Sequence, residues 1–160
     1  MEVERKLAEL GIELPDYSRT PYPGRKYGSM KPHHIVGNVL FLSGHTPTDA
    51  EGKVVYAGRL GQDLTVEQGY QAARYTAVNC LAGIKYALGD LDRVASIVRS
   101  LNFVVCTPDF YNVHLVSSGA TDLFLELWGE ERGLGGRATI GVVSLANNAC
   151  FENWLTLELR

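Results

Sequence analysis

The sequence predicts an α+β domain, spanning residues 1–160, in which a layer of helices covers one face of a β-sheet. Its length, with 46% hydrophobic and 21% charged residues, suits a single domain with a sizeable core. Two segments, 65–89 and 107–129, carry apolar residues at three- and four-residue spacing, which is typical of amphipathic helices. The last segment, 149–159, alternates apolar and polar residues, which indicates a strand with one face toward the helices.

The N-terminal part is expected to hold a short helix followed by a long loop. Apolar residues recur at helical spacing among charges between residues 3 and 10, until Gly11 and Pro15 end the pattern. We therefore treat residues 1–15 as an N-terminal helical extension. Residues 16–32 contain three prolines and four basic residues and are predicted to form a loop, a kind of segment that often supplies binding groups.

A β-hairpin is predicted after this loop. Gly37 and Asn38 separate two apolar runs, and both residues tolerate the positive φ that a two-residue hairpin turn requires. The second run, residues 39–42, is apolar without alternation, which predicts a strand covered on both faces. Residues 53–56 are expected to add a short strand.

Capping signals indicate where the two long helices begin and end. Thr65–Gln68 reads as a capping box at the start of the first helix, and Gly89 suits the left-handed position that closes it. The apolar run 95–106 predicts a central strand. Thr107–Pro108 is expected to begin the second helix, which Gly129 ends.

The closing strand carries a large aromatic residue on its polar face. Trp154 and Thr156 would face away from the helices, where a monomer would leave the indole ring in water. A large aromatic exposed on a sheet face is typical of a surface that a partner covers. The sequence therefore predicts a homo-oligomer.

Composition and motifs exclude several classes of function. The net charge of −3 offers no general attraction for nucleic acid, and no apolar run approaches the ~20 residues needed to span a bilayer. Motifs for nucleotide phosphates, dinucleotides and zinc proteases are absent, so no metal and no cofactor are expected. Three widely spaced cysteines and an N-terminus unlike a signal peptide predict a cytoplasmic protein with reduced thiols.

Three side chains are candidates for chemistry. Arg137 opens an otherwise apolar strand and could hold a carboxylate in its planar fork, or it could be a surface arginine paired with a nearby acid. Glu152 lies on a strand expected to pair with the Arg137 strand, where it would orient Arg137, handle a water or form a plain ion pair. His45 follows a buried strand and could transfer protons near neutral pH, or it could simply cap the strand end.

Five segments, taken together and in order, resemble the RidA (YjgF) family of enamine/imine deaminases. The resemblance runs from about Gly28 to Leu159, and the N-terminal extension is similar to that of a longer subgroup in the family. The resemblance implies a chorismate-mutase-like fold with a mixed β-sheet, two main helices on one face, and a homotrimer with a pocket at each subunit interface. The five segments are Gly37–Gly44, Leu88–Asp92, Val105–Phe110, Gly119–Leu123 and Gly136–Val142.

The resemblance also implies a reaction and a set of site residues. In the family, the arginine at the Arg137 position holds the carboxylate of 2-aminoacrylate or a similar acid, and water releases ammonia to leave a 2-keto acid without metal or cofactor. Thr139 replaces a family cysteine two residues after this arginine. Met30, with Tyr27 nearby, replaces an aromatic residue before the hairpin, and His45 replaces a glutamine.

The last strand departs most from the family pattern. The acid that handles water in the family aligns with Trp154, and Glu152 takes the preceding position on the same face. Because an indole cannot take a proton from water, the resemblance leaves that task to Glu152 or His45, or implies different chemistry. Trp154 would also reshape the pocket and could stack on a planar substrate.

Three functions remain open from the sequence. The first is deamination of a small 2-imino or 2-enamino carboxylate that Arg137 holds. The second is hydrolysis or deamination of a larger ring-cleavage metabolite by His45 and Glu152, with Trp154 as a pocket wall. The third is a non-catalytic trimer that binds carboxylates or partner proteins. RNA cleavage, also associated with the family, is disfavoured by the acidic balance of the chain.

Overall fold

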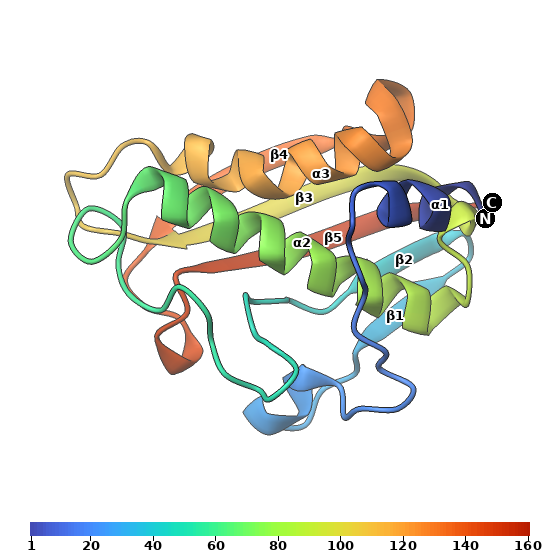
Figure 1. The fold of residues 1–160 in the computed structure, drawn as a ribbon, viewed down its shortest axis with the longest axis horizontal. Helices are drawn as coiled ribbons and strands as arrows, with labels where there is room; N and C mark the ends of the chain where they lie inside the picture. The colour runs from blue at the N-terminus through green and yellow to red at the C-terminus, as the bar shows by residue number, and fades with distance from the viewer.

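A computed structural model describes all residues 1–160 and contains one five-stranded sheet with helices on one side (Figure 1). The helices are α1 (Glu2–Glu9), α2 (Val66–Leu88) and α3 (Val113–Gly133). The strands are β1 (His33–Val36), β2 (Val39–Leu42), β3 (Val94–Val105), β4 (Gly136–Val142) and β5 (Phe151–Leu159). Three short 3₁₀ turns complete the chain: η1 (Pro23–Tyr27), η2 (Leu91–Arg93) and η3 (Ala146–Asn148).

The sheet is mixed, with the strand order β1-β2-β5-β3-β4. Only β3 and β4 run parallel, because α3 forms the crossover between them, and the other neighbours are antiparallel. The predicted pairing of the Glu152 strand with the Arg137 strand is wrong. The last strand lies between β2 and β3, so β3 separates it from β4.

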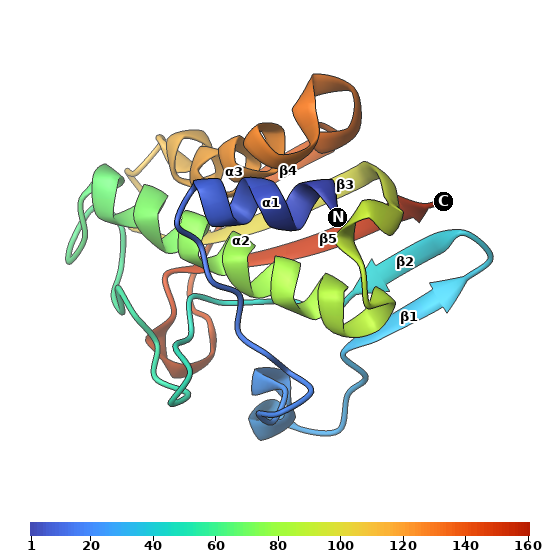
Figure 2. The ribbon, with the colours of Figure 1, turned by 45° about the vertical axis from the view of Figure 1, so that its right-hand side comes forward.

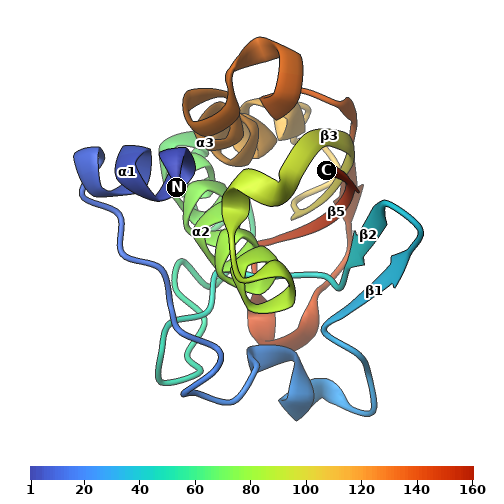
Figure 3. The same ribbon diagram turned by 90° about the vertical axis from the view of Figure 1, so that its right-hand side faces the viewer.

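The helices form two further layers on the sheet, as the end-on view shows (Figure 3). The two long helices α2 and α3 cover one face of the sheet, and α1 lies on their outer side. Val3 and Leu7 of α1 belong to the same 26-residue core as Leu155 and Leu157 of β5. Burial of these apolar side chains, at roughly 25 cal/mol per Å², is what holds the layers together.

The ends of α2 agree with the sequence signals, whereas the start of α3 does not. Thr65 and Gln68 form the predicted capping box, and Gly89 closes α2 with a φ of 78°. The helix expected from Thr107 begins only at Val113, because the Thr107 side chain donates instead to Asp109 and holds a separate turn. Gly129, which was expected to end the helix, interrupts it with a φ of 74°, and α3 continues to Gly133.

The sheet face away from the helices carries exposed apolar side chains. The alternation predicted for β5 is confirmed, with Leu155 and Leu157 buried and Trp154 half exposed. Strand β2 also alternates, so the prediction that it is covered on both faces is wrong for the single chain, and Phe41 is 48% exposed. Residues 53–56 contribute one isolated bridge rather than a strand. A face of this kind favours association with another surface.

Residues 10–32 form a segment that we call the N-terminal strap, which descends from α1 past α2 to η1 and the β1–β2 hairpin (Figures 1 and 2). Tyr17 and Tyr22 of the strap are buried together with Ala82 of α2. Backbone hydrogen bonds between residues 16 and 28 join only neighbours within the strap. Side-chain packing, rather than backbone pairing, therefore fixes this segment against the domain.

Candidate functional site

A cavity of about 230 Å³ brings together five of the residues predicted from the sequence. The strap, the segment after β2, helix α2 and strand β5 each contribute to its wall. Arg137 and Thr139 are not among the lining residues. The predicted residues that line this cavity are Tyr27, Met30, His45, Glu152 and Trp154.

The acidic group of the cavity is Glu152 on β5. Its carboxylate accepts a hydrogen bond from the indole nitrogen of Trp154, two residues further along the same face. Burial raises the pKa of the Glu152 carboxyl, and the hydrogen bond from Trp154 opposes that shift. Gly44 makes room for the pair, since a Cβ at this position would lie 2.7 Å from a carboxylate oxygen. A partly desolvated carboxyl of this kind can exchange a proton with a bound ligand.

His45 forms part of the cavity wall and is only 4% exposed. Its Nδ1 donates to the carbonyl oxygen of Ser43 at 2.8 Å, so Nε2 is the unprotonated nitrogen and has no partner in the chain. Gly83 of α2 lies against Nε2, where a Cβ would be 2.8 Å away. Burial lowers the pKa of His45 to about 4, which keeps the ring neutral at pH 7.

The lining residues that the sequence analysis missed include Tyr17, Tyr22 and Asn79. The rings of Tyr17 and Tyr22 contact each other and the His45 ring, with centroids 5.5 to 6.5 Å apart. Burial raises the pKa of both tyrosines, so both hydroxyls stay protonated. The recurrence of tyrosine at 17, 22 and 27 in a loop rich in proline was the available signal.

Arg137 lies at the edge of the sheet, under α3. Its Nη1 donates to the hydroxyls of Ser118 and Thr121 at 3.2 and 3.1 Å. No carboxylate lies within ion-pair distance, so the surface ion pair considered above is not formed in the chain. Thr139, on the same face of β4, shares a 2.6 Å hydrogen bond with Ser117 of α3. An exposed guanidinium held by two neutral hydroxyls keeps its charge available for an anion.

Within one chain, Arg137 and Glu152 belong to opposite faces of the sheet. Arg137 pairs with Ser100 of β3, whereas Glu152 pairs with Phe103. Successive residues of a strand alternate between the two faces of the sheet, so Ser100 and Phe103 point in opposite directions. Three residues separate them, which is about 10 Å along β3. A single small ligand therefore cannot contact both side chains of the same chain.

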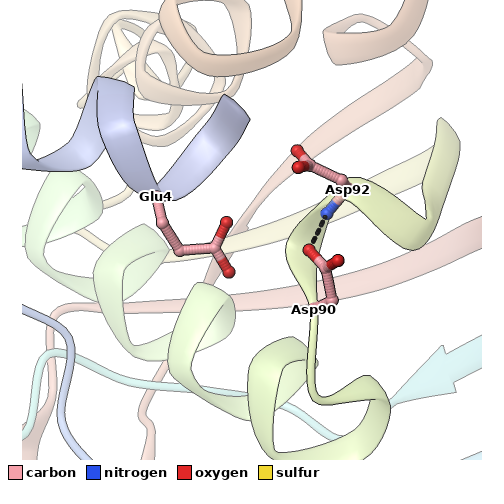
Figure 4. A group of neighbouring side chains, drawn as sticks. All are labelled: Glu4, Asp90 and Asp92. Carbon is pink, nitrogen blue, oxygen red and sulfur yellow. Dashed lines mark hydrogen bonds between the residues drawn. The ribbon is translucent and has the colours of Figure 1, made fainter. Parts of the chain in front are cut away.

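A cluster of acids lies away from the cavity, where Glu4 of α1 meets Asp90 and Asp92 (Figure 4). Asp90 accepts from the backbone nitrogen of Asp92, and Asp92 accepts from the backbone nitrogen of Val3 at 3.0 Å. The backbone hydrogen bonds to the Asp92 carboxyl and its contact with the amino group of Met1 hold its pKa at about 2 despite desolvation. Asp92 therefore anchors the start of α1, and Glu4 Oε1 accepts from the backbone nitrogen of Leu91 at 3.5 Å, whereas Glu4 Oε2 has no partner in the chain.

The fold described above, a mixed five-stranded sheet with two long helices on one face, is a chorismate-mutase-like fold. The family model described as YjgF/chorismate mutase-like, putative endoribonuclease matches residues 4–155. The chain therefore belongs to the YjgF/RidA family. No helix of the chain is both long enough and apolar enough to cross a membrane.

Similar proteins are found both among known sequences and among solved structures. Protein TCP17 of Trypanosoma cruzi is 37% identical over 158 residues, covering 99% of this chain and 94% of that protein. The structure of Atu1372 from Agrobacterium tumefaciens, of unknown function, is 35% identical with a TM-score of 0.87 and covers 99% of this chain and 94% of its own. Escherichia coli TdcF with bound serine, at 17% identity and a TM-score of 0.60, covers 83% of this chain and 89% of its own and supports the fold alone.

Proposed function

We propose that this protein is a cofactor-free deaminase that hydrolyses 2-imino or 2-enamino carboxylates to 2-keto acids and ammonia. One observation carries the proposal: the chain presents two complementary half-sites. Arg137 is a cation without an acidic partner. The cavity around Glu152 contains one acid and no cation. A substrate with a carboxylate at one end and a protonated imine beside it matches the two half-sites in charge.

We propose that the half-sites meet between neighbouring copies in a homotrimer. Family members are in general trimers that bind small molecules. The sheet face that bears Glu152 and Trp154 also exposes apolar side chains from three further strands, namely Val36, Phe41 and Ile140. A neighbouring copy that covers this face would bury them and could bring its own Arg137 to the mouth of the cavity. Each site would then contain Glu152 of one copy and Arg137 of the next.

The reaction follows from these groups. The guanidinium binds the substrate carboxylate through two parallel hydrogen bonds and fixes the C2 carbon near Glu152. A 2-enamino acid first takes a proton at C3 from the Glu152 carboxyl and becomes the iminium. Water then adds to C2 while the Glu152 carboxylate takes its proton. Glu152 then passes that proton to the amino nitrogen of the tetrahedral intermediate. The C–N bond breaks and ammonia leaves as the C2 hydroxyl gives its proton to the Glu152 carboxylate and the C2 carbonyl forms, which restores the Glu152 carboxyl.

Glu152 is better suited than His45 to move protons in this scheme. The carboxyl has a raised pKa, which brings it closer to neutrality, whereas the pKa of His45 is lowered to about 4. The free nitrogen of His45 lies against Gly83 of α2. We therefore assign His45 to the wall of the cavity and assign the proton transfers to Glu152.

The test is an ammonia-release assay with 2-aminoacrylate generated in the cuvette. The wild-type protein is expected to accelerate release above the spontaneous rate, and Arg137→Ala to lower kcat/KM by about a hundredfold, since a bidentate charged contact is lost. Arg137→Lys keeps the charge but loses the fork, so it should recover only part of the rate. Arg5→Ala removes an exposed arginine on α1 and serves as the matched control.

Unchanged turnover in Arg137→Ala would contradict the proposed clamp. Thermal stabilisation by pyruvate without any release of ammonia would instead identify a protein that binds carboxylates without catalysis.

A further inference from the structure

The cavity is larger than the smallest substrates of such a reaction require. An apolar protein cavity of roughly 150 Å³ accommodates benzene. The cavity beside Glu152 measures about 230 Å³ within a single chain. The side chain of 2-iminopropanoate is one methyl group and would leave most of this space unfilled. A larger side chain would bury more of its own apolar surface in this space, so the volume favours a substrate with a larger side chain.

The walls of the cavity select for a flat side chain. Tyr17, Tyr22 and His45 form a three-ring cluster, with the Tyr22 and His45 rings nearly perpendicular at 72°. Tyr27 of the strap and Trp154 of β5 add two further aromatic rings to the lining. Aromatic pairs prefer offset-stacked or edge-to-face contacts, which a planar ligand can make with several of these walls at once.

Buried polar atoms in the same walls call for a polar group on the ligand. The hydroxyls of Tyr17 and Tyr22 and the amide oxygen of Asn79 have no hydrogen-bond partner in the chain. These three residues are 7%, 4% and 2% exposed, and all three line the cavity. A buried polar atom without a partner is destabilising. A ligand that carries a hydroxyl or a ring N–H could supply donors and acceptors to them.

No cationic side chain lines the cavity, so it offers no charge to pair with a carboxylate. The carboxylate end of the substrate must therefore remain at the mouth, and the opposite end enters. Two of the rings and both of the unpartnered hydroxyls come from Tyr17 and Tyr22 of the strap. The strap therefore supplies much of what distinguishes one side chain from another.

We infer that this protein acts on 2-imino acids whose side chain is a planar ring bearing a hydrogen-bonding group, such as a hydroxyphenyl or indolyl ring, and that Tyr17 and Tyr22 determine this preference. The inference rests on the proposed function, since it takes the carboxylate to be held by Arg137 of a neighbouring copy. It adds the class of side chain that the cavity receives.

The experiment compares imino acids that differ only in the side chain. An L-amino-acid oxidase with oxygen and catalase converts tyrosine, tryptophan, phenylalanine, leucine and alanine to their 2-imino acids, and semicarbazide traps the imine that remains. We expect kcat/KM for the tyrosine- and tryptophan-derived imines to exceed that for the alanine- and leucine-derived imines at least tenfold, with the phenylalanine-derived imine between them. Equal values, or a preference for the alanine- or leucine-derived imine, would overturn the inference.

Variants of the strap test which residues set the preference. Tyr22→Leu should reduce the ratio of kcat/KM for the tyrosine- and tryptophan-derived imines to kcat/KM for the leucine-derived imine. Tyr17→Phe should reduce the ratio of kcat/KM for the tyrosine-derived imine to that for the phenylalanine-derived imine. Tyr111→Leu replaces a tyrosine that is 80% exposed and lies outside the cavity, so both ratios should stay at the wild-type values. Ratios unchanged in all three variants would remove Tyr17 and Tyr22 from the role assigned to them.

A binding measurement separates failure of this inference from failure of the proposed reaction. The affinities of 4-hydroxyphenylpyruvate, phenylpyruvate and pyruvate are measured by calorimetry on the intact protein. Tighter binding of the hydroxyphenyl acid without acceleration of any imine would overturn the deaminase and support the cavity preference. Acceleration of every imine with equal affinities for the three keto acids would support the deaminase and overturn the preference.

Discussion

The two half-sites of this chain differ in almost every physical respect. Arg137 lies on the edge strand, exposed to solvent and held by the hydroxyls of Ser118 and Thr121. Glu152 lies on an inner strand, half buried in a cavity with aromatic walls, and its pKa is raised by that burial. The first half-site suits recognition of a charge, and the second suits movement of a proton.

This difference explains why neither half-site can bind an acidic substrate on its own. An exposed guanidinium in water binds a lone carboxylate weakly, because solvent screens the interaction. A partly buried carboxyl without a cation cannot hold an acidic ligand. Bringing the two together would exclude water from the arginine and supply the positive charge that the cavity lacks.

The largest effect is expected when the two half-sites are damaged in different copies. Arg137→Ala and Glu152→Gln should each lower kcat/KM by about a hundredfold or more, since one loses the clamp and the other the proton carrier. If each site joins Arg137 of one copy to Glu152 of the next, every mixed trimer of the two variants should contain one intact site out of three. Activity is measured on mixed assemblies purified through two different affinity tags.

Activity of the mixed assemblies no higher than that of either variant alone would show that both residues act within one copy or that one of them is not required. Assemblies mixed from Arg137→Ala and Arg137→Lys copies provide the control, because no combination of these copies restores the clamp.

Acid is expected to lower the stability of the protein mainly through the buried half-site, where His45 lies. The pKa of His45 is about 4 in the folded protein and about 6.5 in the unfolded chain, so only the unfolded chain takes up this proton between those values. Stability is therefore lost as the pH falls from 6.5 to 4, by up to about 3 kcal/mol from this residue. Denaturant unfolding at a series of pH values measures the loss, and His45→Gln should reduce it.

The control is His114→Gln, which changes an exposed histidine on α3. That variant should lose stability with falling pH as the wild type does. Identical pH dependence in His45→Gln and the wild type would mean that the imidazole takes up its proton without unfolding.

The smallest effect is expected from the hydroxyls that support Arg137. Thr121→Val and Ser118→Ala each remove one hydrogen bond, of 3.1 or 3.2 Å, that Nη1 donates to an uncharged hydroxyl. Each bond contributes about 1 kcal/mol, so KM should rise several-fold while kcat changes little. A large fall in kcat with unchanged KM would place these hydroxyls in the chemical step rather than in positioning the clamp.

Much of the fold could be predicted because it is encoded locally. The capping box at Thr65, the cap at Gly89 and the alternation of β5 depend on residues a few positions apart, and each was confirmed. The position of β5 between β2 and β3 could not be predicted, since strand pairing depends on contacts far apart in the sequence. The expected contact between Arg137 and Glu152 was wrong for this reason.

The site shows the same contrast. Motifs led to Arg137, His45 and Glu152, because their chemistry can be recognised in sequence. Tyr17 and Tyr22 lie in a segment without periodicity, and their burial depends on how the strap packs against α2. Asn79 lies within the regular pattern of α2, so nothing local marks its amide oxygen as one without a hydrogen-bond partner.

The contact between Gly83 and the His45 ring couples the evolution of two positions that lie 38 residues apart in the sequence. A methyl group at 83 would overlap the imidazole, and a slimmer residue at 45 would leave a hole beneath α2. Neither position is free to mutate alone without a loss of stability. Homologues should therefore inherit changes at 45 and 83 as a matched pair, a bulkier side chain on the helix accompanying a smaller one after β2.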